Sequence, residues 1–177
     1  MYTQPNPQDL LQPGAHNLSL VNLAVASPPT SVGQALINRN KTILIAALQS
    51  MGAKVVEIEY EGSGDEGSVS SVWATSSPSF AQEDNPEMTD RLEQEKVDTW
   101  NPVIPHWDLF SAPENIELKT GTLLDALMDF AWYVLETKKP GWEINEGSNG
   151  TVTINLVENT VSLDHSAVYR ECDSIEI

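Results

Sequence analysis

The sequence predicts an α+β fold in which two helices pack on one face of an antiparallel sheet. Apolar residues recur at helical spacing in two segments, at residues 32–51 and 122–137. Each segment is followed by two short stretches in which apolar and polar residues alternate. Alternation with a period of two is typical of strands with one buried face, so each helix precedes a predicted strand pair.

Residues 1–33 are predicted to form an extended, proline-rich arm. Five prolines fall in this range, and each one removes a backbone donor and restricts the residue before it. Within the arm, residues 18–25 are apolar enough to lie against the body of the protein as an extended segment. The remainder, residues 34–177, is predicted to be a single α+β domain.

Both predicted helices carry signals at their ends. Gly52 directly follows the first helix, 32–51, where a left-handed residue would close it. The second helix, 122–137, begins with Thr122 and Asp125 in the spacing of a capping box and is followed by a Pro-Gly pair. These end signals support both helix assignments.

The strand pairs follow the helices. Residues 54–60 and 69–74 form the first pair, joined by the glycine-rich run 61–67, whose three glycines permit positive φ. Residues 151–156 and 160–164 form the second pair, a β-hairpin. The inward side chains of this hairpin are predicted to be Val152, Ile154, Leu156, Val161 and Leu163.

The range 75–119 is predicted to be an irregular insertion. It contains loop-like serine and proline runs, a short charged helix at 88–97, and an apolar stretch that Pro105 demotes to an edge strand or packed loop. The helix-strand-strand order occurs on both sides of this insertion. A duplicated unit and a chance likeness of two glycine-rich loops both remain open as explanations.

Charge is the outlying property of the chain. Nine Lys+Arg against 26 Asp+Glu give a net charge of −17. Direct binding of nucleic acid or an anionic membrane is disfavoured, because both need a positive surface. A partner protein with a basic surface, or a divalent cation, fits better, and solubility alone would also account for the charge.

The sequence contains neither a membrane-spanning stretch nor a signal peptide, which predicts a cytoplasmic protein. Cys172 is the only cysteine. A disulfide within the chain and a cysteine zinc cluster are therefore excluded.

Two glycine-rich acidic loops are the candidate binding sites. The candidate residues are Asp65 and Glu66 in the first loop and Trp142, Glu143, Asn145 and Glu146 in the second. If the sheet brings both loops to one end, their carboxylates can converge on Ca²⁺ or Mg²⁺. The alternative is that the glycines only make turns and the acids keep those turns hydrated. No other cofactor is predicted.

Asp164 and His165 complete the candidate binding residues. Adjacent residues of a strand point to opposite faces, so these two cannot orient one another. With Leu163 inward, His165 should also point inward and Asp164 outward. A histidine at the edge of the core fits this position better than a catalytic base, and no nucleophile elbow is present. No catalytic residue is predicted.

Three short blocks resemble a known family. Residues 60–67 match the pattern Y-x-G-x-G-D-x-G, residues 141–150 resemble G-W-E-N-N-D-G-x-x-G, and Asp164-His165 with Tyr169 resembles a third block. With both helices, they resemble an uncharacterised bacterial domain-of-unknown-function family over roughly 35–75 and 120–172. The resemblance implies an α+β fold and no established activity. Ile144 and Glu146 depart from the asparagine and aspartate of that family.

Two functions of different classes follow. The first is a non-enzymatic, strongly acidic protein-binding module, acting as an inhibitor or accessory subunit of a basic protein that handles nucleic acid. The alternative is a divalent-cation-binding protein, with metal-dependent hydrolysis as its extension. The charge and the lack of a catalytic signature favour the first.

Overall fold

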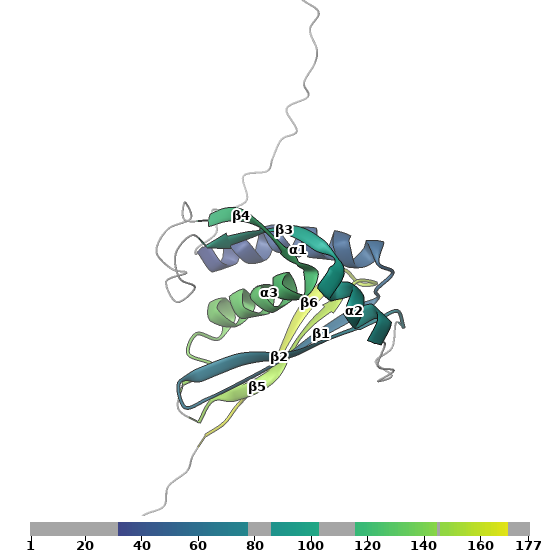
Figure 1. The fold of residues 1–177 in the computed structure, drawn as a ribbon. Helices are drawn as coiled ribbons and strands as arrows, with labels where there is room; N and C mark the ends of the chain where they lie inside the picture. Colours follow the sequence, from purple (N-terminus) through teal and green to yellow (C-terminus); the bar gives the residue numbers. More distant parts are fainter. Residues whose placement is uncertain (1–31, 78–85, 103–115, 145, 170–177) are drawn as a thin grey trace, which may run out of the picture.

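The computed structural model describes residues 32–77, 86–102, 116–144 and 146–169, and it has an α+β fold (Figure 1). The described residues form three helices and two antiparallel sheets. Their order is α1 (Val32–Ser50), β1 (Val55–Ser63), β2 (Glu66–Thr75), α2 (Pro86–Gln94), β3 (Lys96–Pro102), β4 (Ile116–Thr122), α3 (Leu123–Lys138), β5 (Ser148–Asn155) and β6 (Thr160–Ala167). Residues 1–31 of the predicted arm and Cys172 lie outside the described residues.

The elements are arranged in layers (Figure 1). A four-stranded sheet has the order β2-β1-β5-β6, and α3 lies between this sheet and α1. The β3–β4 ribbon packs beside α1, and α2 packs against β2 and α3. No described helix has the length and apolar character needed to cross a membrane.

The predicted placement of two helices on one sheet face is not confirmed. Helix α3 contacts β1 and β2, whereas α1 packs mainly on α3 and β3. The reason is that β3 provides a second surface against which α1 packs, and the sequence pattern did not predict this strand. A repeated unit is also not confirmed, because α1 and α3 hold different positions relative to the sheet.

The core lies between α1, α3 and the inner face of the large sheet. Its fully buried side chains have less than 2 % of their surface exposed. The largest of them are Tyr60, Phe130, Leu36, Leu44, Leu48, Ile58, Leu92, Leu123, Leu127, Leu135 and Ile154. The predicted apolar stripes of both long helices contribute to this set, as burial of apolar area requires.

The helix ends agree with the sequence signals. Gly52 has φ +81° just after α1, in the left-handed region that favours glycine. At the start of α3, the Thr122 hydroxyl accepts a hydrogen bond from the backbone N–H of Asp125 at 3.0 Å. Local chemistry therefore sets both boundaries.

The first hairpin is longer than predicted. Strands β1 and β2 continue to Ser63 and Glu66, and only Gly64 and Asp65 form the turn, with φ values of +63° and +70°. Two successive residues with positive φ are typical of a type I′ hairpin turn, whose twist matches that of the strands. The seven-residue turn expected at 61–67 is corrected accordingly. The second hairpin, β5–β6, forms where the alternation predicts it.

Regular elements occupy part of the range 75–119. It contains α2, β3 and the first part of β4, while residues 78–85 and 103–115 lie outside the described residues. Met88, Leu92 and Val97 are buried against the core. The apolar positions are sparse and separated by charges, so the sequence pattern underestimates this packing.

Candidate functional site

The two glycine-rich loops meet at one end of the large sheet. Strand β1 pairs with β5 so that Gly62 lies opposite Ser148. The β1–β2 turn and the segment leading into β5 are therefore neighbours. The backbone N–H of Asp65 donates to the carbonyl oxygen of Glu143 at 3.1 Å, which joins the loops directly.

Trp142 fills the space between the loops and the core. Only 3 % of its surface is exposed. Its ring makes edge-to-face contacts with Tyr60, at 5.4 Å between centroids, and with Trp132, at 5.3 Å. The indole N–H donates to a Glu136 carboxylate oxygen at 3.2 Å, and the Trp142 carbonyl accepts from the Ser148 hydroxyl at 2.8 Å. The residue is an anchored part of the core.

Two glycines of the first hairpin provide the room for this indole. A Cβ atom on Gly62 would lie 2.7 Å from the Cα atom of Glu143 and 3.0 Å from the Trp142 ring. A Cβ atom on Gly67 would overlap the Trp142 ring itself. Both glycines lie within strands and lack positive φ. Their role is close packing, and the prediction that they belong to the turn is corrected.

His165 lies on the inner side of β6, as its strand position predicts. Its Nδ1 atom is 2.6 Å from the Tyr60 hydroxyl, and the two rings are stacked at 6.1 Å. The same hydroxyl donates to the backbone carbonyl of Asp164 at 3.3 Å. A hydroxyl has one proton. Both contacts are satisfied together when Nδ1–H donates to Tyr60, a tautomer that leaves Nε2 as an acceptor. The Asp164 side chain is exposed.

Gly150 makes this contact across the sheet possible. It is the pairing partner of both Tyr60 on β1 and His165 on β6. A Cβ atom on Gly150 would lie 2.7 Å from the Tyr60 hydroxyl oxygen. The missing side chain on β5 therefore lets tyrosine reach a histidine two strands away.

Burial shifts the pKa of both partners. Burial lowers the pKa of His165 below its ordinary value, and the nearby Lys139 ammonium lowers it further. Burial also raises the pKa of Tyr60 to about 12, with the Asp164 carboxylate adding to the effect. Both side chains are therefore favoured in their neutral forms, which suits hydrogen bonding between them.

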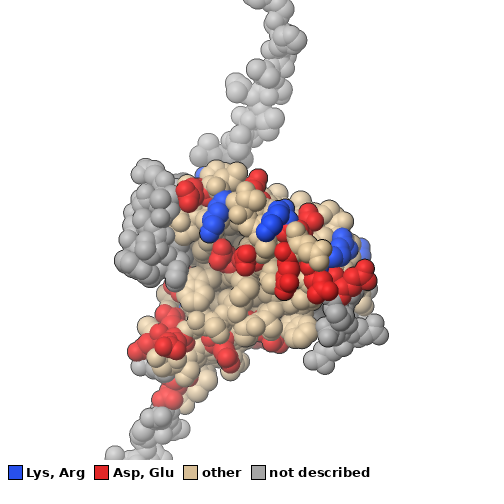
Figure 2. Space-filling model, in the orientation of Figure 1, with Lys and Arg blue, Asp and Glu red and all other residues tan. Residues whose placement is uncertain are grey.

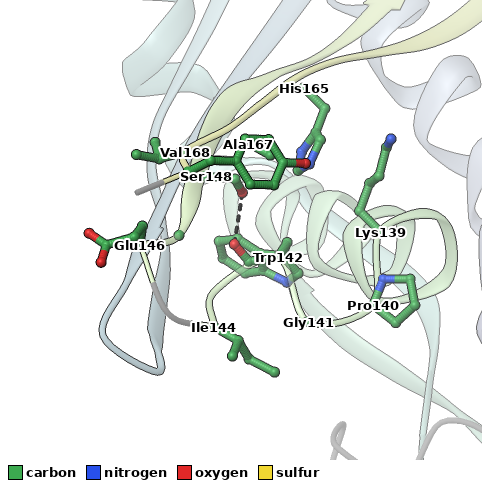
Figure 3. A pocket seen from close by; sticks show the side chains of 12 residues that line it. Lys139, Pro140, Gly141, Trp142, Ile144, Glu146, Ser148, His165, Ala167 and Val168 are labelled. Carbon is green, nitrogen blue, oxygen red and sulfur yellow. Dashed lines mark hydrogen bonds between the residues drawn. The ribbon is translucent and has the colours of Figure 1, made fainter. Parts of the chain in front are cut away.

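A cavity of about 500 Å³ opens beside these residues (Figure 3). Trp142, His165 and Lys139 contribute to its wall. Three of the six exposed large apolar side chains of the described residues also line it. They are Ile144, Val168 and Tyr169. An exposed apolar cluster around a buried aromatic residue is the usual composition of a binding surface.

A second cavity, of about 450 Å³, adjoins the first. Glu61 and Glu66 line it, and the two cavities share Glu146, Ser148 and Val168 as lining residues. Among the described residues, no lysine or arginine lines this second cavity. One cavity is thus bordered by apolar side chains and its neighbour by carboxylates.

The predicted site residues are only partly brought together. Trp142, Glu146 and His165 line the first cavity and Glu66 the second, while Asp65 and Glu143 join the loops through their backbones. Asn145 lies outside the described residues. Among the described side chains, no three of His, Cys, Asp or Glu are grouped to hold a metal ion. The cation hypothesis therefore gains no support from the described part of the chain. Tyr60, Lys139, Ser148 and Val168 also belong to the site, although they are not among the site residues predicted from the sequence.

Comparison with known proteins gives a family and no activity. Residues 36–176 match the model of a family of unknown function, DUF6878. No curated protein and no solved structure matches the chain significantly.

Proposed function

Since the chain belongs to this family of unknown function, we propose its function from the site itself, as an acidic protein-binding module for a partner with a basic surface. The observation that carries the proposal is the pair of adjoining cavities at the end of the sheet. An apolar side chain of the partner enters the cavity around Trp142, and a lysine or arginine beside it enters the cavity lined by Glu61 and Glu66.

The charge distribution supports a basic partner. The four strands of the large sheet contain five acidic residues and no lysine or arginine. On the face shown in Figure 2, acidic side chains are spread over much of the surface, whereas the basic ones gather in its upper part. Such a surface steers a cationic partner and repels nucleic acid. If the partner handles nucleic acid, this protein would compete with the nucleic acid for the basic surface of the partner. It would then act as an inhibitor or accessory subunit of that partner.

The test is affinity capture from the native host with three baits. The baits are the unaltered chain, the double variant Ile144→Ser/Tyr169→Ala, and the control Val157→Ser. Val157 is 61 % exposed at the β5–β6 turn and lines neither cavity. We expect one basic protein to be captured by the unaltered chain and the control and to be lost from the double variant.

Salt dependence gives the second criterion. Raising the salt from about 0.1 M to about 1 M shortens the Debye length from about 10 Å to about 3 Å and should release the partner. Capture that survives high salt, or that the Val157 control loses to the same extent as the double variant, would refute the proposal.

A further inference from the structure

Trp73 is an exposed tryptophan on the edge strand of the large sheet. Strand β2 is the outermost strand on its side, and 46 % of the Trp73 surface is exposed. The neighbouring residues Val72 and Ala74 point into the core, so Trp73 points to the outer face. Exposed tryptophans are enriched among the residues that dominate binding surfaces.

Hydrogen bonds fix the orientation of this indole. The Trp73 ring N–H donates to the Ser71 hydroxyl at 3.1 Å, and that hydroxyl donates to a Glu59 carboxylate oxygen at 2.6 Å. The polar atom of the indole is thus satisfied within the strand pair. The described residues leave 46 % of Trp73 exposed, so the ring they present to a partner is accessible and already ordered.

Two carboxylates of β1 lie on the same face of the sheet as the ring. Glu57 is the cross-strand partner of Trp73, and Glu59 is the partner of Ser71. Side chains directly opposite in an antiparallel pair lie on one face, with Cβ atoms about 4.5–5.5 Å apart. Glu57 is half-buried, and burial and the charge of Glu59 both raise its pKa. A cation between these two carboxylates would relieve their repulsion.

An apolar groove of about 400 Å³ runs beside Trp73. Val72 forms part of it, with Leu124 and Met128 from α3 and Thr89 and Asp90 from α2. Asp90 is the one charged residue among the described residues that line it. The groove lies on the side of β2 that faces α2 and α3, and Trp73 borders it at the edge of the sheet. A site for an apolar side chain therefore adjoins, across this edge strand, a site for a cation on the outer face.

The chain already contains one arginine stacked on a tryptophan, which is the interaction that this site would make with a partner. The guanidinium carbon of Arg39 lies 4.7 Å from the ring centre of Trp100. Within the part of the chain that the structure describes, no arginine or lysine is placed in this way over Trp73. A planar guanidinium stacks on tryptophan and meets carboxylates at the same time, which an ammonium does less well.

We infer that the Trp73 face of β2, with the adjoining groove, binds an arginine side chain of a partner protein together with a neighbouring apolar residue. The inference shares with the proposed function only the basic character of the partner. Its surface is separate from the two cavities at the loop end, since their lining residues do not overlap.

The probe is the peptide acetyl-Gly-Leu-Arg-Leu-Gly-amide, followed by nuclear magnetic resonance on the full chain. The indole N–H signal of Trp73, assigned by its loss in Trp73→Ala, should move on titration. Replacing arginine by citrulline keeps the shape and removes the charge, and should weaken binding about fivefold to tenfold, with lysine giving an intermediate affinity. Equal binding of the citrulline peptide would overturn the inference.

Variants locate the site. Glu57→Gln should weaken binding of the arginine peptide about fivefold, whereas Glu158→Gln, the same charge change at an exposed turn, should not. Asp90→Lys should weaken it more than Glu93→Lys, an exposed position of the same helix outside the groove. Equal effects within each pair would indicate bulk electrostatics and contradict a defined site.

Two further outcomes would refute the assignment. Loss of peptide binding in Ile144→Ser/Tyr169→Ala, with Trp73→Ala unchanged, would place the peptide in the loop-end cavities and leave the proposed function standing. A Trp73 signal that moves with protein concentration alone would assign this face to a second copy of the chain. Loss of peptide binding in Trp73→Ala, with binding by Ile144→Ser/Tyr169→Ala unchanged, supports the inference whatever the two cavities at the loop end bind.

Discussion

The hydroxyl of Tyr60 lies 2.6 Å from Nδ1 of His165, across 105 residues of sequence and two strands of the sheet. Strand β5 lies between them, and it places Gly150 at the crossing point. The contact therefore depends on three residues that the chain brings together from three strands. Of the two partners, His165 also lines the cavity beside Trp142, so the contact holds one lining residue of that cavity in place.

His165 should titrate below its ordinary value of 6.5 in the folded protein. Burial is the larger cause and Lys139 the smaller, so Lys139→Gln should raise the pKa without restoring it fully. Titration of the ring signals by nuclear magnetic resonance gives both values. A midpoint at or above 6.5 in the unaltered chain would contradict the burial seen here.

The lowered pKa of His165 also makes the free energy of unfolding depend on pH. Between the lowered folded pKa and 6.5, the unfolded chain binds more protons than the folded chain. The free energy of unfolding should therefore fall as the pH is lowered through this window and level off below the folded pKa. His165→Gln should lack this part of the profile in urea denaturation.

Tyr60 should affect stability at alkaline pH. Its pKa rises from 10 when unfolded to about 12 when folded. The neutral form is favoured by folding, so its contribution is complete below pH 10 and is lost as the pH rises toward about 12. Tyr60→Phe should show a smaller alkaline loss, measured by urea denaturation. Tyr133, whose pKa burial also raises, is present in both proteins and serves as the common background.

Gly67 and Trp142 should be energetically coupled. Gly67→Ala places a methyl group against the indole and should destabilise by about 1–3 kcal/mol, as overpacking does. Trp142→Ala removes a buried aromatic side chain and should cost about 3–5 kcal/mol. In the Trp142→Ala background, Gly67→Ala should lower the free energy of unfolding only slightly, because the indole that the added methyl group would meet is absent.

Gly121→Ala is the matched control for this cycle, since a Cβ atom there meets nothing within 4 Å and its φ is not positive. Chemical denaturation of the four proteins of the cycle gives the coupling energy. Additive effects of Gly67→Ala and Trp142→Ala, or an unchanged melting curve for Trp142→Ala, would show that the indole does not pack against Gly67.

Glu143 should be a source of instability. One of its carboxylate oxygens is buried and has no hydrogen-bond partner among the described residues. Burying a charged group without a partner costs more than burying a neutral one. Glu143→Gln should therefore raise the free energy of unfolding by about 1 kcal/mol, measured by chemical denaturation. Glu158→Gln, on an exposed turn, should change it by less than about 0.5 kcal/mol. A marked destabilisation by Glu143→Gln would instead indicate that the carboxylate has a partner.

The sequence alone determined the local structure. Apolar spacing placed α1 and α3, the Thr122–Asp125 pair and Gly52 placed helix boundaries, and alternation placed the β5–β6 hairpin. These features depend on residues a few positions apart, so their physical causes are visible in a short window. The inward position of His165 followed from the same alternation.

Only the tertiary structure decided what the loop glycines do and how the layers stack. Gly62 and Gly67 resemble turn residues in the sequence, yet they make room for an indole about 75 to 80 positions later, and Gly150 makes room for Tyr60. The position of α1 on α3 and β3 likewise follows from packing between distant segments. Close packing of this kind is set by neighbours in space, and one sequence does not state which residues those are.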